Sequence, residues 1–144
     1  MNSKGVFLII IAFFVSCTLL GQTSGIDGKY TREINTNEGG KIAYNLVLEQ
    51  DSTFTFTYYR KLATDRAEQT THCQGSWTLL NAKKIELIAN TKLFDTPDFI
   101  NLEETKAHYI TKSPRDKSGR KVPTVLKIYQ TNIPWFKGIV LEKQ

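Results

Sequence analysis

The sequence contains few of the residues that carry most enzyme and metal chemistry. It has two histidines and two cysteines among 144 residues, and it lacks the Gly-x-Ser-x-Gly segment that presents a nucleophilic serine. A zinc site needs three or four convergent ligands, and no spacing of carboxylates marks out the missing ones. We therefore expect a protein that is not an enzyme and that binds no metal and no cofactor.

Cysteine is scarcer still beyond the first residues of the chain. Cys73 is the single cysteine after residue 21, so it has no partner for an internal disulfide if Cys17 is removed with the first residues. If this segment is a strand, His72 and Cys73 point to opposite faces. Because Cys73 shares its face with Trp77, we expect a buried thiol, with His72 at the surface.

The long apolar run in the sequence is too short to span a membrane. Residues 5–16 follow Lys4, the only charged residue before them, and this order is typical of a secretory signal. A membrane-spanning helix needs about 20 apolar residues. We therefore predict that residues 1–21 are a signal peptide and that the protein is exported, either secreted or periplasmic.

Two alternatives remain for the end of this signal. An ordinary signal peptidase prefers small residues one and three positions before the cut. Gly21 meets the first preference and Leu19 does not meet the second, and we expect the mature chain to begin at Gln22. In the alternative, Ser16 and Cys17 form the end of a lipoprotein signal, and Cys17 is lipidated and anchors the protein. We expect contact with a membrane only in that second case.

The chain is modestly basic, with a net charge of +5. Its most basic segment, residues 112–121, has no aromatic side chains that would stack on bases, so we do not expect nucleic-acid binding. The segment is a predicted turn with a candidate surface for an anionic partner, formed by Lys112, Arg115, Lys117, Arg120 and Lys121.

Alternation of apolar and polar residues predicts a single all-β domain over residues 22–144. Residues 41–50 and 53–62 alternate most regularly, and Asp51 and Ser52 between them predict a tight hairpin. A short helix is expected near residues 96–104, with Thr96 as its N-cap and Pro97 at its first position. Further strands are expected at residues 28–34, 72–80, 83–90, 106–113, 124–132 and 135–144. About eight strands joined mostly by short turns predict a small antiparallel meander, either a barrel or a sandwich.

Aromatic side chains fall on the predicted inner face of this meander. They are Phe54, Phe56, Tyr58 and Trp77. A barrel of about eight strands is either filled by such side chains or holds one small ligand. We take the four aromatics as the candidate lining for a small apolar or amphipathic ligand. The alternative is an interaction module that contacts its partner through residues 112–121.

Three segments of the sequence resemble a known class of barrel. They are Gly28-Lys29-Tyr30, the hairpin YNLVLEQDSTFTFTY and the segment GSWTLLNAKKIELI. Together they resemble small exported lipocalin-like β-barrels, including the N-terminal domain of the NlpE-type envelope lipoproteins. The resemblance covers residues 28–90 and implies a barrel that binds rather than catalyses. The Cys-x-x-Cys pair of the NlpE-type proteins is absent here, so their copper-response and disulfide-sensing roles are not expected.

Overall fold

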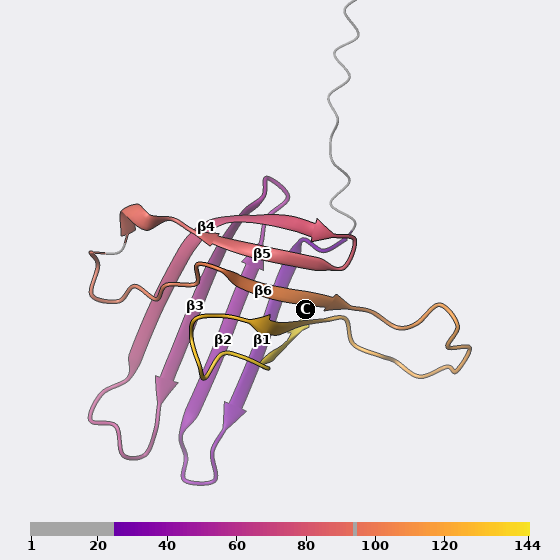
Figure 1. The fold of residues 1–144 in the computed structure, drawn as a ribbon. Helices are drawn as coiled ribbons and strands as arrows, with labels where there is room; N and C mark the ends of the chain where they lie inside the picture. The colour runs from indigo at the N-terminus through magenta and orange to yellow at the C-terminus, as the bar shows by residue number, and fades with distance from the viewer. Residues whose placement is uncertain (1–24, 94) are drawn as a thin grey trace, which may run out of the picture.

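Each strand of the protein pairs with the next strand along the chain, and the last strand pairs with the first. The structure is a computed structural model, which describes residues 25–93 and 95–144. The strand pairs are antiparallel and close into a barrel, which confirms the predicted all-β meander (Figure 1). The strands are β1 (Gly28–Asn35), β2 (Lys41–Leu48), β3 (Thr53–Lys61), β4 (Gln69–Asn81), β5 (Lys84–Ala89), β6 (Thr105–Ile110), β7 (Val125–Gln130) and β8 (Val140–Lys143).

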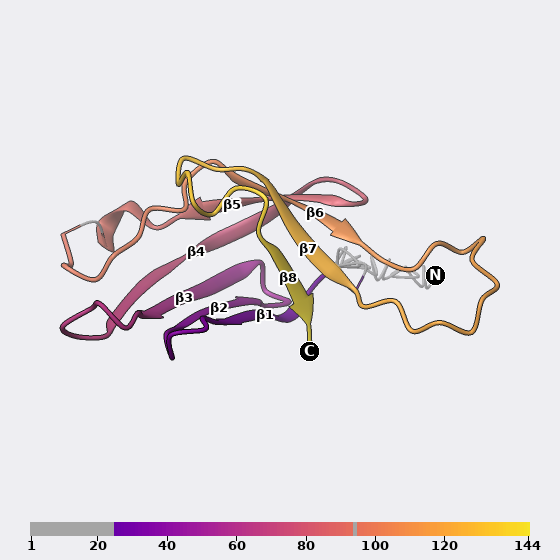
Figure 2. The same cartoon turned by 90° about the horizontal axis from the view of Figure 1, so that it is seen from below.

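Seen from below, the barrel separates into a layer of β1 to β4 and a layer of β5 to β8 (Figure 2). Strands of the first layer hold 8 to 13 residues, and strands of the second hold 4 to 6. Each residue adds about 3.3 Å to a strand, so the first layer extends beyond the second. Loops, rather than strands, therefore face the inner side of its far end.

The predicted β2–β3 hairpin forms with the tight turn expected from Asp51 and Ser52. The Asp51 carboxylate accepts hydrogen bonds from Thr53 N at 3.0 Å and from Thr53 Oγ1 at 2.6 Å. Ser52 adopts a positive φ of 68°, and its amide donates to Glu49 O at 3.1 Å. Local hydrogen bonds of this kind reverse the chain and fix the register of the two strands.

Inward-facing side chains of both layers form one apolar core. Burial alternates along most of β2 and along the first half of β3 with the period of two that strand geometry imposes. Trp77 is 3% exposed, and its Nε1 donates to Glu49 O at 3.0 Å, so the buried indole has a hydrogen-bond partner. The largest fully buried side chains are Tyr30, Phe54, Phe56, Phe136, Ile26, Leu46, Leu48, Ile85, Leu87, Leu102, Leu126 and Ile128.

The long strand β4 joins the two layers by pairing with both. Its residues 69–76 pair with β3, and its residues 75–81 pair with β5. The two ladders overlap at Gly75 and Ser76. A Cβ added at Gly75 would lie 2.0 Å from the carbonyl oxygen of Ile88. Only glycine allows so close an approach of two backbones.

Two predictions of secondary structure were wrong. The helix expected near residues 96–104 does not form, because this segment pairs with β4. His72 N donates to Asp98 O at 2.7 Å, and Ile100 N donates to His72 O at 2.9 Å. A short 3₁₀ helix lies just before it, at Thr91–Leu93. The last strand begins at Val140 and not at residue 135, because residues 131–139 form a loop.

Candidate functional site

The four aromatics predicted to line a ligand cavity fall into two groups. Phe54, Phe56 and Trp77 are 1 to 3% exposed and belong to the core of the barrel. Tyr58 is half-buried and lines an open cavity at the end of β3. The end of the barrel, and not its closed middle, therefore holds the most accessible of the predicted side chains.

This cavity of about 470 Å³ lies within the usual range for small-molecule sites. Its walls come from β3 and β4, from the segment that pairs with β4, and from the loop of residues 131–139. We call it the aromatic cup, and its lining residues are Tyr58, Arg60, Gln69, Thr71, Phe99, Ile100 and Trp135.

Strand alternation places the β3 and β4 residues of the cup together. Tyr58 and Arg60 are two positions apart on β3 and so share its inner face. Tyr58 lies opposite Thr71, and Arg60 lies opposite Gln69. One wall of the cup thus consists of the Tyr58 ring and a polar rim. The rim is formed by the side chains of Arg60, Gln69 and Thr71.

Aromatic contacts hold the opposite wall in place. Phe136 is fully buried, and its ring centroid lies 5.2 Å from that of Phe56 and 5.9 Å from that of Tyr44. Its neighbour Trp135 is 45% exposed and lies over Tyr58, with ring centroids 4.5 Å apart and planes inclined by 30°. Phe136 therefore anchors the loop in the core, and Trp135 presents its ring to solvent.

An ion pair fixes the arginine of the cup. Arg60 Nη2 lies 3.3 Å from Asp65 Oδ1, and Asp65 Oδ2 accepts a hydrogen bond from Leu62 N at 2.9 Å. Burial raises the pKa of Tyr58 above its usual value, and the nearby Arg60 opposes this shift. The Tyr58 hydroxyl therefore stays protonated at neutral pH and can donate a hydrogen bond.

Thr71 adds a polar group whose hydrogen-bonding capacity is unused. Its Oγ1 is buried and has no hydrogen-bond partner among the residues that the structure describes. A buried hydroxyl without a partner costs free energy, so this position of the cup wall is less stable than a fully hydrogen-bonded one would be.

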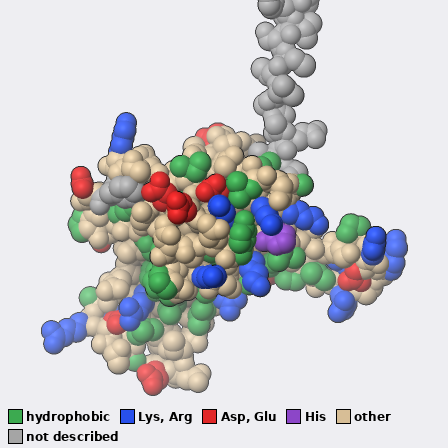
Figure 3. Space-filling view, viewed as in Figure 1, with side chains coloured by type: hydrophobic (Ala, Val, Ile, Leu, Met, Phe, Trp, Pro, Cys, Tyr) green, Lys and Arg blue, Asp and Glu red, His purple; other side chains and the backbone are tan. Residues whose placement is uncertain are grey.

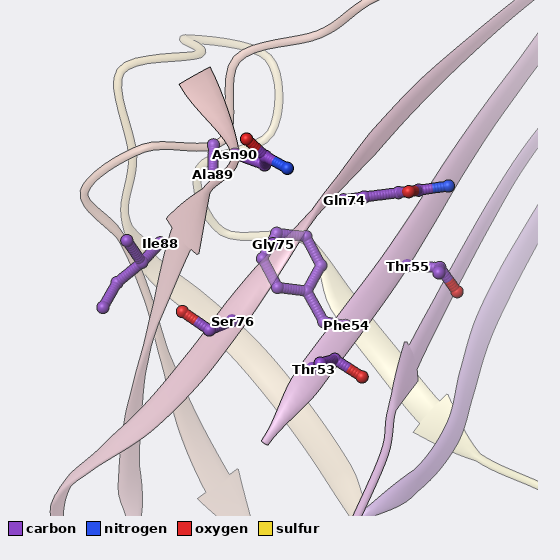
Figure 4. A pocket seen from close by; sticks show the side chains of 9 residues that line it. All are labelled: Thr53, Phe54, Thr55, Gln74, Gly75, Ser76, Ile88, Ala89 and Asn90. Carbon is purple, nitrogen blue, oxygen red and sulfur yellow. The ribbon is translucent and has the colours of Figure 1, made fainter. Parts of the chain in front are cut away.

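A second hollow lies where β3, β4 and β5 meet (Figure 4). It measures about 530 Å³ and is lined by Thr53, Phe54, Thr55, Gln74, Gly75, Ser76, Ile88, Ala89 and Asn90. None of these side chains titrates near neutral pH, so the lining offers no general base to activate the hydroxyls of Thr53, Thr55 and Ser76.

His72 and Cys73 lie as strand geometry requires, on opposite faces of β4. Cys73 is 1% exposed, and its burial raises the pKa of the thiol. His72 is exposed, with Nδ1 3.4 Å from Thr57 Oγ1. Within residues 25–93 and 95–144, no three His, Cys, Asp or Glu side chains gather as a metal site would require.

The predicted basic segment, residues 112–121, lies in the long connection between β6 and β7, which projects away from the barrel (Figure 1). Lys112 and Arg120 make contacts within this connection, whereas Arg115, Lys117 and Lys121 are exposed. Cys17 and the predicted signal peptide lie outside the described residues. No helix among the described residues has the length and apolar character needed to cross a bilayer.

Comparisons with protein-family models, with curated proteins and with solved structures found no match for this chain. Sequence reasoning identified Tyr58 as a site residue but missed the rest of the cup. The available signal for Trp135 was a large aromatic residue between Pro134 and Gly138, two residue types that are common in loops.

Proposed function

We propose that the protein binds a small amphipathic ligand in the aromatic cup and does not catalyse a reaction. The observation that carries this proposal is Trp135, which stays 45% exposed while lying against Tyr58 at the mouth of a cavity of about 470 Å³. Removing the apolar faces of an indole from water is favourable. A ligand that covers the exposed face of Trp135 would therefore be stabilised by the hydrophobic effect that also stabilises the core.

The lining of the cup indicates the chemistry of its ligand. Trp135, Phe99 and Ile100 offer apolar surface for a ring or an alkyl chain. Arg60 and Gln69 lie side by side on the rim and offer N–H groups to an acceptor such as a carboxylate. A ligand with an apolar body and a polar, preferably anionic, head fits both parts.

Titration with laurate tests this proposal, with dodecanol as the uncharged comparison. We expect a change in tryptophan emission with laurate, and weaker binding of dodecanol because it lacks the anionic head. Trp135→Ala should lower the affinity for laurate, measured by calorimetry, by about tenfold, since the indole supplies much of the buried apolar area. Arg60→Gln should reduce the preference for laurate over dodecanol.

Ile88→Ala serves as the matched control for Trp135→Ala. Ile88 is 46% exposed, nearly the same as Trp135, but it lines the second hollow instead of the cup. The control should bind laurate like the unmodified protein. Equal affinities of the unmodified protein and Trp135→Ala would refute a site at the cup.

We also propose that the protein works outside the cytoplasm, with residues 1–21 acting as its signal peptide. The support is the order of charge and apolar residues in this segment. The intact mass of protein recovered from separate membrane and soluble fractions tests this. A start at Gln22 supports a free exported protein, an acylated Cys17 supports an anchored one, and an uncleaved chain in the cytosol would refute export.

A further inference from the structure

The outer face of β5, β6 and β7 carries a row of basic side chains. Lys84 lies directly opposite His108, and His108 lies directly opposite Lys127. Each of the three is adjacent in sequence to a fully buried residue, so all three point away from the core. We call these three residues the basic row. The two lysines of the row therefore flank His108 on the same outer face, and an anion lying across the row would meet both ammonium groups and an imidazole N–H donor.

The basic row continues into the projecting connection of residues 111–124, which we call the basic arm. Ile110 and Val125 form the last pair between β6 and β7, two residues beyond the His108–Lys127 pair, and the arm begins directly after them. Figure 2 shows the arm extending outward from the ends of these strands. In Figure 3, Lys and Arg side chains gather around a histidine and appear again on the arm, on the same side of the molecule.

Two of the five basic residues predicted as a contact surface instead maintain the shape of the arm. Lys112 Nζ donates to the carbonyl oxygens of Ser118 and Arg120, the latter at 3.0 Å. Arg120 Nη2 lies 3.4 Å from Asp116 Oδ2, and its Nε donates to Ser118 Oγ at 3.1 Å. These two cations are therefore less available to a partner than sequence reasoning suggested.

The other three cations of the arm are available. Arg115, Lys117 and Lys121 are exposed, and none of them forms an ion pair with any residue that the structure describes. With the basic row they form a strip of positive charge that starts on β5, crosses two strands and runs out along the arm.

We propose that this strip, the basic row together with Arg115, Lys117 and Lys121, binds a linear polyanion of the acidic-polysaccharide class. The strip is interrupted by carboxylates on the same outer face, because Glu86 lies opposite Lys106 and Glu142 lies opposite Val125. A flat, densely anionic bilayer would meet these carboxylates as well as the cations. A single chain can follow the cations and avoid the carboxylates.

Binding of the full chain to dextran sulfate tests the proposal, with neutral dextran and anionic phosphatidylglycerol vesicles as the two comparisons. We expect binding to dextran sulfate that weakens steeply as salt rises, because the contacts are between exposed charges. Neutral dextran should not bind. Binding to the vesicles as tight as that to dextran sulfate would overturn the linear polyanion in favour of a membrane surface.

Paired charge variants separate the row from the arm. Each lysine near an anionic surface contributes about a fivefold gain in affinity. The row variant Lys84→Gln with Lys127→Gln should therefore bind dextran sulfate about 25-fold more weakly, and the arm variant Lys117→Gln with Lys121→Gln should lose a similar factor.

The control variant Lys92→Gln with Lys137→Gln removes the same charge from exposed positions outside the strip. It should lose only a small part of the affinity. A row variant that binds as well as this control would overturn the proposal, because the arm would then act alone. Lys84 is half-buried, and its Nζ lies 5.5 Å from the centroid of the Tyr129 ring, whereas the other substituted lysines are exposed. Matching melting temperatures would show that each variant is folded. The row variant should bind laurate with unchanged affinity. A failure of the polyanion proposal can therefore be distinguished from a failure of the proposal that the aromatic cup binds a ligand.

Discussion

Truncating Phe136 to alanine tests whether one buried ring holds the loop that forms half of the aromatic cup. Phe136 is fully buried, and its ring lies against those of Phe56 and Tyr44. Truncation of a buried phenylalanine costs about 3–5 kcal/mol, because apolar contacts are lost and a cavity remains. A single domain is typically stable by about 5–15 kcal/mol, so Phe136→Ala should lose a large part of the stability of the protein.

Urea unfolding, followed by circular dichroism, measures this loss. The midpoint should fall while the slope with denaturant stays constant, since the surface exposed on unfolding hardly changes. Phe136→Leu keeps most of the volume and should cost less than about 1.5 kcal/mol. A cost for Phe136→Ala no greater than that of Phe136→Leu would refute the view that the ring anchors the loop.

Three further predictions concern the barrel itself. Gly75→Ala should lower the yield of folded protein, measured by near-ultraviolet dichroism, because its Cβ would lie 2.0 Å from the Ile88 carbonyl oxygen; a normally folded variant would contradict the close approach. Hydrogen bonds from Thr53 lower the pKa of Asp51, so this carboxylate stabilises the fold above its unfolded pKa of about 3.9, and that contribution is lost as pH falls. Asp51→Asn should therefore flatten the fall in melting temperature between about pH 5 and pH 2, and an unchanged profile would count against the turn. Burial raises the pKa of Cys73, so an added disulfide reagent should react with the thiol only after urea unfolds the protein, and rapid reaction in buffer would disprove its burial.

Local patterns were enough to predict most of the strands. The β2–β3 hairpin was predictable because alternation and turn chemistry both act within a few residues, as the Asp51–Thr53 bonds show. The helix near residues 96–104 was wrongly predicted from an equally local signal, a Thr-Pro pair. Backbone groups of Asp98 and Ile100 bond to His72 instead, and pairing with a residue so distant in sequence has no local signature.

The candidate site was less predictable than the fold. Tyr58 was found because it continues the alternation of Phe54 and Phe56 along β3. Trp135 and Phe99 reach the cup from two loops, and loops have no periodicity that would indicate which side chains point inward. Trp135 was even assigned to a strand, because the apolar residues around it suggested continuous pairing up to the end of the chain.

The position of the cup follows from the unequal lengths of the two layers. At about 3.3 Å per residue, the 13 residues of β4 extend much further than the 4 residues of β8. Where strands of both layers face each other, their side chains fill the space between them, as Phe54 and Trp77 do. Beyond the end of the short strands, the inner face around Tyr58 meets a loop, which places Phe136 in the core and leaves Trp135 over the cavity. An accessible aromatic surface at the end of the barrel is therefore a consequence of strand length, and it does not require the barrel itself to be hollow.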